Sequence, residues 1–167
     1  MEQNDKTIDV LKTAILLERK GKAFYTQAAR NSESKSAQKI FEMMAEEESA
    51  HIDFLVKQFK NYQAHHAFLD NEAQPEEDET VVQILTEKIK TEISAAGFEA
   101  AAISAAIDFE NRAIEVYSNR AKEATDPKEK ETYQMLADWE KTHHGLLYKL
   151  NEDLKEQIWN DNNFWPF

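Results

Sequence analysis

The chain has 167 residues, the length of one domain with a substantial core. It carries 32 Asp and Glu against 20 Lys and Arg, and the net charge of −12 makes nucleic acid and anionic membrane surfaces poor partners. It has no cysteine, which excludes disulfides, zinc–thiolate sites and thiol nucleophiles. No uncharged stretch approaches the roughly 20 apolar residues of a membrane span. Its polar, acidic N-terminus is unlike a signal peptide, so we expect a cytoplasmic protein.

The first half of the chain predicts two long helices. Apolar residues recur at intervals of three and four rather than two, and only three Gly and three Pro interrupt them, which indicates an all-α chain. The amphipathic pattern places helices at about residues 6–31 and 35–61. A polar connection follows, and Thr80 with Gln83 forms a capping box that predicts the start of a further helix. We expect Gly97 to interrupt that helix.

The second half repeats this organisation. A helix is predicted from Phe98 to about Glu123. Asp126 and Pro127 then supply an N-cap and a first helical residue, so a last helix is expected at about 127–158. An aromatic tail follows at 159–167.

Four long helices with short turns inside each pair describe a four-helix bundle with one crossover. We expect a single domain, 1–167, made of a hairpin at 6–61, a crossover at 62–97, a hairpin at 98–158 and the aromatic tail. The two hairpins are also copies. A shift of 92 residues aligns 14–59 with 106–151, and 11 of the 46 positions are identical. Chance would give roughly three or four, so the halves form an internal repeat.

The repeat carries a shared set of polar residues. In each half a helical Glu is followed 30 residues later by Glu-x-x-His. One helical turn separates the Glu and the His of that motif, so both point the same way. All these positions continue apolar rows, and we therefore predict that they face the bundle core. The six residues are Glu18, Glu48, His51, Glu110, Glu140 and His143.

Burying four carboxylates together without partners would cost many kcal/mol or force them to take up protons. Two divalent metal ions would bring +4 against the −4 of the glutamates. Oxygen-rich donors with one imidazole for each metal favour Fe or Mn over structural Zn, and the pattern is that of di-iron carboxylate bundles. We predict two Fe ions; Mn or a mixed Fe/Mn pair would accept the same ligands. The alternative is a bundle whose site holds no metal.

These motifs make the chain resemble the ferritin-like superfamily, specifically the rubrerythrin-like di-iron proteins. The resemblance rests on the paired motifs, on Phe24-Tyr25 after Glu18 and on Ala45-Glu46-Glu47 before Glu48, and it covers roughly residues 8–155. It implies a ferritin-like bundle with two metal positions. By resemblance, Glu18 and His51 hold one iron, Glu110 and His143 hold the other, and Glu48 and Glu140 bridge them.

The chain also departs from rubrerythrins proper. Ala113 stands one turn after Glu110, where those proteins carry a further Glu, and His143 stands where they carry a Glu. With no cysteine in the sequence, we expect no rubredoxin domain. The resemblance therefore implies that electrons come from a separate donor protein.

Tyr25 and Tyr117 each follow a predicted ligand Glu by seven residues, two turns along the same face. We predict that each phenol donates a hydrogen bond to a ligand carboxylate of the opposite half and orients it. The alternative is an ordinary core tyrosine.

The expected function is reduction of hydrogen peroxide or dioxygen at the di-iron centre, in a homodimer. One alternative is a ferroxidase that stores iron in a cage, and another is a non-catalytic structural bundle. The sequence leaves open the metal, the oxidant, the donor and the role of the aromatic tail.

Overall fold

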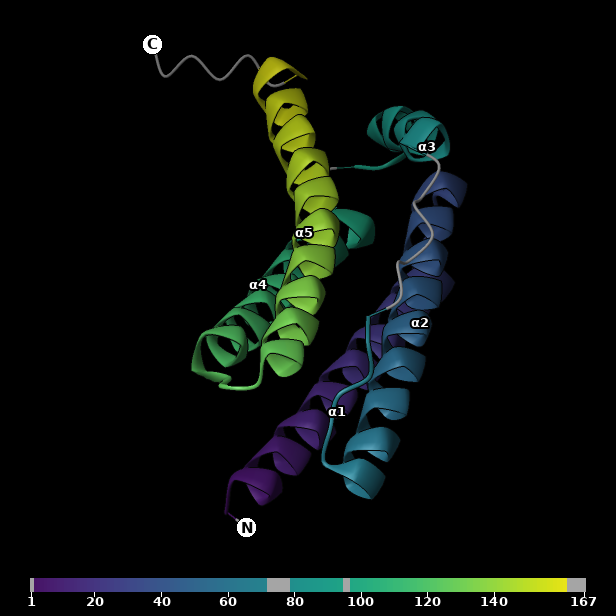
Figure 1. Ribbon diagram of the computed structural model, residues 1–167. Coiled ribbons are helices and arrows are strands. Elements are labelled where there is room, and N and C mark those ends of the chain that lie inside the picture. The colour runs from purple at the N-terminus through teal and green to yellow at the C-terminus, as the bar shows by residue number, and fades with distance from the viewer. Residues whose placement is uncertain (1, 72–78, 95–96, 162–167) are drawn as a thin grey trace.

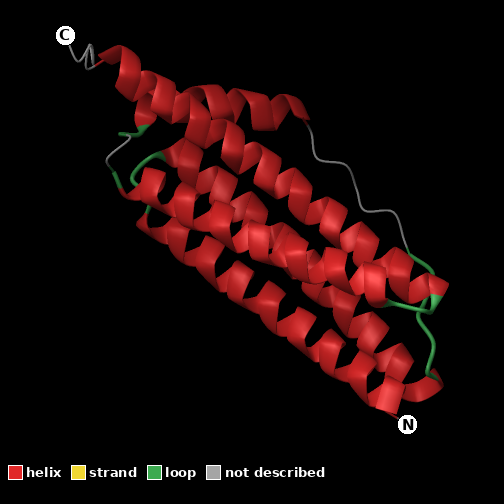
Figure 2. Ribbon diagram, turned by 90° about the vertical axis from the view of Figure 1, so that its left-hand side faces the viewer, coloured by secondary structure: helices red, strands yellow, loops and turns green. Residues whose placement is uncertain are grey.

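The computed structural model describes residues 2–71, 79–94 and 97–161, which form five α-helices and no strand. Four are long: α1 (Glu2–Asn31), α2 (Lys35–His65), α4 (Phe98–Glu123) and α5 (Pro127–Asp161). A shorter helix, α3 (Glu79–Glu92), lies in the crossover. Helix α1 packs along α2 and α4 along α5, so two hairpins form an all-α bundle as predicted (Figures 1 and 2). In the described ranges, no helix is long and apolar enough to cross a bilayer.

Several helices are longer than predicted. Helix α1 begins at Glu2 instead of about residue 6, and α2 continues to His65 instead of ending near residue 61. Buried Tyr62 packs on Phe68, with ring centroids 5.2 Å apart, and anchors this additional turn. Helix α5 continues to Asp161, so residues 159–161 of the predicted tail are helical. Residues 162–167 lie outside the described residues.

Helix α3 was predicted, but its start was wrong. Thr80 is already inside the helix, so it is not the N-cap that its spacing from Gln83 indicated. The helix buries Thr86 and Ile89 and lies near the end of the bundle where α5 ends (Figure 1). This helix ends at Glu92, before it reaches Gly97, and Gly97 is the N-cap of α4, so the break between the two helices begins earlier than predicted.

Two carboxylates, one at the end of α3 and one in the first turn of α4, cap the first hairpin. Glu92 accepts hydrogen bonds from Ser34 Oγ (2.6 Å), Ser36 N (3.1 Å) and Ser36 Oγ (2.9 Å). Glu99 accepts from the backbone N–H groups of Glu33 (2.7 Å) and Ser34 (3.1 Å). These bonds satisfy N–H groups at the start of α2, where the helix dipole also favours negative charge. They fasten the crossover to the turn between α1 and α2.

The turn between α4 and α5 has the predicted cap. Asp126 Oδ1 accepts from the backbone N–H of Lys128 (2.7 Å) and of Glu129 (3.2 Å). Asp126, directly before α5, therefore accepts from two backbone N–H groups that have no acceptor within the first turn of the helix.

The core consists of two apolar clusters at different levels of the bundle. One includes Phe41, Ile103 and Leu150, and the other includes Leu11, Leu55 and Leu136. Along every long helix, the predicted polar residues fall between the two clusters: Glu18 in α1, for example, lies between Leu11 and Tyr25. The bundle therefore has a polar layer in the middle of its length, closed by apolar side chains on both sides.

Candidate metal centre

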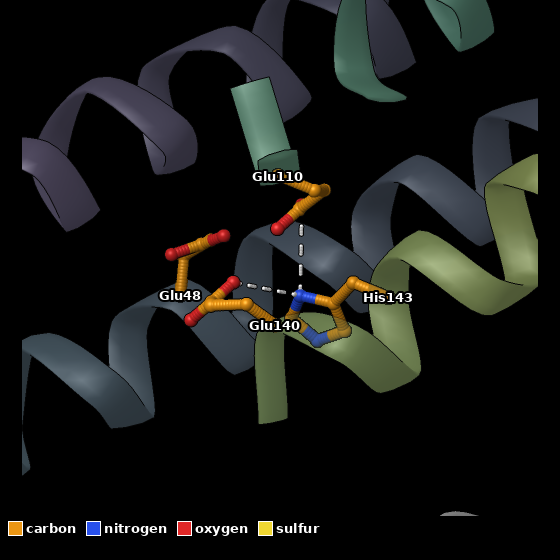
Figure 3. A group of neighbouring side chains, drawn as sticks. All are labelled: Glu48, Glu110, Glu140 and His143. Atoms are coloured by element: carbon orange, nitrogen blue, oxygen red, sulfur yellow. Dashed lines mark ion pairs between the residues drawn. The ribbon is translucent and has the colours of Figure 1, made fainter. Parts of the chain in front are cut away.

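The six predicted ligands come together in this layer. Helix α1 provides Glu18, α2 provides Glu48 and His51, α4 provides Glu110, and α5 provides Glu140 and His143. Every one is buried, with at most 6% of its surface exposed. Their donor atoms form two groups, each within 4.8 Å: Glu48, Glu110, Glu140 and His143, and Glu18, Glu48 and His51. In Figure 3 the four side chains of the first group converge from three helices.

Two glutamates belong to both halves of the layer. Glu140 places Oε1 3.2 Å from His51 Nδ1 and Oε2 3.4 Å from His143 Nδ1, so its carboxylate spans the two histidines. Glu48 is a member of both groups of donor atoms. Glu18 Oε2 lies 3.1 Å from His51 Nδ1, and Glu110 Oε1 lies 3.7 Å from His143 Nδ1. This arrangement supports the predicted pairs, with Glu48 and Glu140 between them.

The polar atoms of the layer are short of partners. No hydrogen bond within the described part of the chain reaches either oxygen of Glu48 or Glu140, Oε2 of Glu110 or Nδ1 of His143. Nor does any lysine or arginine there form an ion pair with the four glutamates. Buried carboxylates without compensation are costly. The donor set and its charge therefore fit two divalent cations.

The pKa values in the layer follow from burial and crowding. Burial, and then the charges of Glu18 and Glu140, raise the pKa of Glu48 well above its ordinary value. Burial raises the pKa of Glu110 to about 7. Burial alone would lower the pKa of His51, but the carboxylates of Glu140 and Glu18 raise it to about 9. Protons thus compete with metal ions for these donors, and metal binding must release protons.

Burial would likewise raise the pKa of Glu140, but contacts with His143 and His51 lower it below the ordinary value. The carboxylate of Glu140 therefore keeps its negative charge between the two histidines. Its position, with one oxygen near each histidine, is what favours Glu140 as a ligand for both metal positions.

The two tyrosines link the hairpins as predicted. The Tyr25 hydroxyl in α1 donates to Glu110 Oε1 in α4, and the Tyr117 hydroxyl in α4 donates to Glu18 Oε1 in α1. Burial first, and then the neighbouring carboxylates, raise the pKa of both phenols well above the ordinary value. Each hydroxyl therefore keeps its proton and stays a donor that fixes a carboxylate.

The sequence did not identify two residues that contact the histidines from outside. Glu47 Oε2 contacts His143 Nε2, and the Trp139 ring stacks on His51 with centroids 4.8 Å apart. Both precede the Glu of a Glu-x-x-His motif, and the 92-residue shift aligns them with each other. The different residue types at these two aligned positions could have drawn attention to them in the sequence. Helical periodicity alone, however, does not show which histidine Glu47 or Trp139 contacts.

A cavity of about 790 Å³ leads to the histidine side of the layer. It lies between α2, α3 and α5, and its walls include Glu47, His51 and His143, with Val82 and Thr86 of α3 on the facing side. A small molecule therefore has a route to the predicted ligands that passes beneath the crossover helix.

Comparison with known families agrees with this arrangement. The family model described as Rubrerythrin matches residues 9–151, which include all six predicted ligands. Comparisons with curated proteins and with solved structures gave no match. With most of the chain matched and the buried cluster of glutamates and histidines fitting a di-iron site, the chain belongs to the rubrerythrin family.

Proposed function

We propose that the protein is a di-iron oxidoreductase that reduces hydrogen peroxide or dioxygen with electrons from a separate donor protein. The observation that carries the proposal is the polar layer, in which four glutamates and two histidines converge within an apolar core. Most of their carboxylate oxygens have no hydrogen-bond donor among the described residues. Membership of the rubrerythrin family supports the same chemistry. The oxygen-rich donor set favours Fe, with Mn as the alternative metal.

Each half of the layer would hold one metal ion. The proposed ligands are Glu18 and His51 for one ion, Glu110 and His143 for the other, and Glu48 and Glu140 between them. When bound, two redox-active ions supply two electrons and Lewis acidity for reduction of an O–O bond. With peroxide, the balance is H₂O₂ + 2e⁻ + 2H⁺ → 2H₂O. This chain has no cysteine and so no iron–sulfur or rubredoxin-type centre, which is why we propose a separate donor.

The protein groups position and protect the centre. Tyr25 donates a hydrogen bond to Glu110 and Tyr117 donates one to Glu18. These bonds fix the orientation of the two carboxylates for metal binding. The apolar clusters above and below the layer exclude bulk water from it. The cavity beside His51 and His143 admits a molecule as small as peroxide or dioxygen. No protein nucleophile is needed.

Metal analysis and oxidation kinetics test the proposal. Protein purified without oxygen, and reconstituted with Fe(II), should hold two irons per chain. Its ultraviolet–visible spectrum is then followed after mixing with one equivalent of peroxide or with dissolved oxygen. A faster change with peroxide supports a peroxidase, and a faster change with oxygen shifts the assignment to an oxidase or ferroxidase. Absence of bound Fe(II) and Mn(II) after reconstitution would refute a metal-dependent function.

Particle size separates the proposed enzyme from an iron store. We propose a homodimer, whose mass would be about 39 kDa, twice the 19.3 kDa of the chain. Light scattering of the iron-loaded protein measures this mass. A large closed shell that takes up many irons per chain would instead identify a storage protein.

A further inference from the structure

The two halves of the proposed centre are related by the 92-residue repeat. The repeat aligns Glu18 with Glu110 and His51 with His143. The tyrosines obey the same relation, because each donates to the carboxylate of the opposite half. In residue type the ligands and tyrosines of the two halves are therefore equivalent, although four donors gather around Glu110 and His143 and three around Glu18 and His51. A difference in chemistry between the two positions must come from the residues around them.

The symmetry breaks at the residue before each Glu-x-x-His motif. In the first hairpin this residue is Glu47, whose Oε2 contacts Nε2 of His143 across the bundle. In the second hairpin it is Trp139, whose ring stacks on His51 across the bundle, at 4.8 Å and with 13° between the planes. Each histidine is therefore supported by the opposite hairpin, one by a carboxylate and the other by an aromatic ring.

These supports differ in their chemistry. An imidazole that ligates a metal through one nitrogen carries its proton on the other, and a carboxylate that accepts this proton fixes the tautomer and makes the ligating nitrogen more basic. His143 has this arrangement: Nε2 faces Glu47, while Nδ1 has no hydrogen bond to any described residue and faces Glu110 and Glu140. An indole has no acceptor for such a proton. Trp139 can orient the His51 ring but cannot polarise it.

We propose that Glu47 is a positioning residue that makes the metal position of Glu110 and His143 the tighter of the two, so that this position fills first. The inference rests on the proposed metal centre and adds a chemical difference that the residue types of the aligned ligands do not contain. Glu47 is suited to this role, because its side chain is 24% exposed and lines the cavity while its oxygen reaches a buried histidine.

Titration of the full-length apoprotein with Co(II), without oxygen and against a competing chelator, tests the proposal. The visible absorption of bound Co(II) should reveal two sites of unequal affinity in the wild type. Glu47→Ala should weaken the tighter site by about 10–100-fold, the usual effect of removing a carboxylate behind a ligand histidine, and leave the weaker site unchanged. Glu47→Gln retains a neutral acceptor and should give an intermediate loss.

Glu46→Ala is the matched control. It removes the same charge from the adjacent, exposed position of α2 and should leave both Co(II) affinities unchanged. The position that fills first is assigned from imidazole ¹⁵N NMR at one equivalent of diamagnetic Zn(II). His143 should be metallated through Nδ1 with a proton on Nε2, while His51 is not yet bound.

The outcomes separate the two proposals. Three results would overturn the role of Glu47 while leaving the metal centre in place. Glu47→Ala could weaken both sites equally, it could weaken neither site, or His51 could be metallated before His143. A wild-type protein that binds neither Co(II) nor Zn(II) would refute the metal centre itself. Far-UV circular dichroism of each apoprotein shows whether it is folded. If the Glu47→Ala protein is unfolded, the Co(II) affinities of Glu47→Gln are compared with the wild type instead.

Discussion

Gly21 on α1 lies directly against the ring of Phe109 on α4. A Cβ on Gly21 would be 2.8 Å from Phe109 Cε1 and 3.1 Å from the carboxyl carbon of Glu48. A carbon–carbon contact of 2.8 Å is shorter than the contacts that Cβ atoms make in real proteins, so the glycine is what lets α1 and α4 close over the proposed ligand Glu48. The repeat aligns Gly21 with Ala113, so the second hairpin accommodates a methyl group at the equivalent level.

We expect Gly21→Ala to destabilise the protein by about 1 kcal/mol, because overpacking costs about 1–3 kcal/mol and the better helix propensity of alanine returns up to about 1 kcal/mol. It should also weaken metal binding, since the new methyl group displaces Glu48. Urea unfolding and Co(II) titration measure the two effects. Gly145→Ala is the control, because a Cβ at that exposed position meets nothing within 4 Å. It should stabilise α5 by up to about 1 kcal/mol. Stabilisation by both substitutions would contradict the close approach at Gly21.

Tyr25→Phe and Tyr117→Phe should each reduce the free energy of unfolding of the apoprotein by about 1–2 kcal/mol, because each leaves a buried carboxylate oxygen without its donor. Tyr133→Phe is the matched control. Tyr133 is fully buried, but its hydroxyl has no hydrogen-bond partner among the described residues, so its removal should be neutral or stabilising. Urea denaturation gives all three values. If the three substitutions changed the free energy of unfolding by the same amount, the hydrogen bonds to Glu110 and Glu18 would make no contribution to stability.

Glu48→Gln and Glu140→Gln should both weaken metal binding but should differ in their effect on the stability of the apoprotein. Burial and neighbouring carboxylates raise the pKa of Glu48, so the Glu48→Gln apoprotein should melt at the same or a higher temperature than the wild type. Glu140 is a carboxylate partner of both His51 and His143, so Glu140→Gln removes a buried partner of two histidines and should lower the melting temperature. Each also removes a ligand shared by both metal positions, so metal content should fall below two ions per chain. Differential scanning calorimetry and elemental analysis provide the measurements. Glu46 is exposed, so Glu46→Gln should change neither the melting temperature nor the metal content. If the Glu48→Gln protein still bound two metal ions per chain, Glu48 would not be a bridging ligand.

The cap formed by Glu99 should make stability depend on pH. Burial would raise the pKa of Glu99, but hydrogen bonds from the backbone N–H groups around Ser34 lower it below its ordinary value of 4.5. A carboxyl whose folded-state pKa is lowered stabilises the protein above its unfolded pKa, and this contribution disappears as the pH falls through the folded-state pKa. Glu99→Gln should therefore lose about 1 kcal/mol at pH 7, and this difference should vanish in acid.

Urea unfolding of the wild type and Glu99→Gln between pH 3 and pH 7 checks this prediction. Glu115→Gln makes the same chemical change on the exposed face of α4 and should stay within about 0.5 kcal/mol of the wild type throughout. A Glu99→Gln deficit that did not depend on pH would show that the carboxylate charge contributes nothing to the cap.

Much of the fold and of the candidate site could be predicted from the sequence because both depend on local periodicity. Spacing of three and four placed the long helices, and the same spacing put Glu48 and His51 on the inward face of one helix. The repeat then doubled the signal, since Glu140 and His143 have the same spacing in the second hairpin. Helix ends were less accurate, because α2 gains its last turn from the packing of Tyr62 on Phe68, a contact beyond the helix.

By itself, then, the sequence determined an all-α bundle, the polar layer in its core and the six residues that form it. Only the tertiary structure decided that Glu47 reaches His143, that Trp139 stacks on His51, and that Glu92 and Glu99 cap α2. The physical reason is that helical periodicity specifies the direction in which a side chain points from its own helix. The residue that it meets depends on the relative height and rotation of the helices, which packing of the whole core sets.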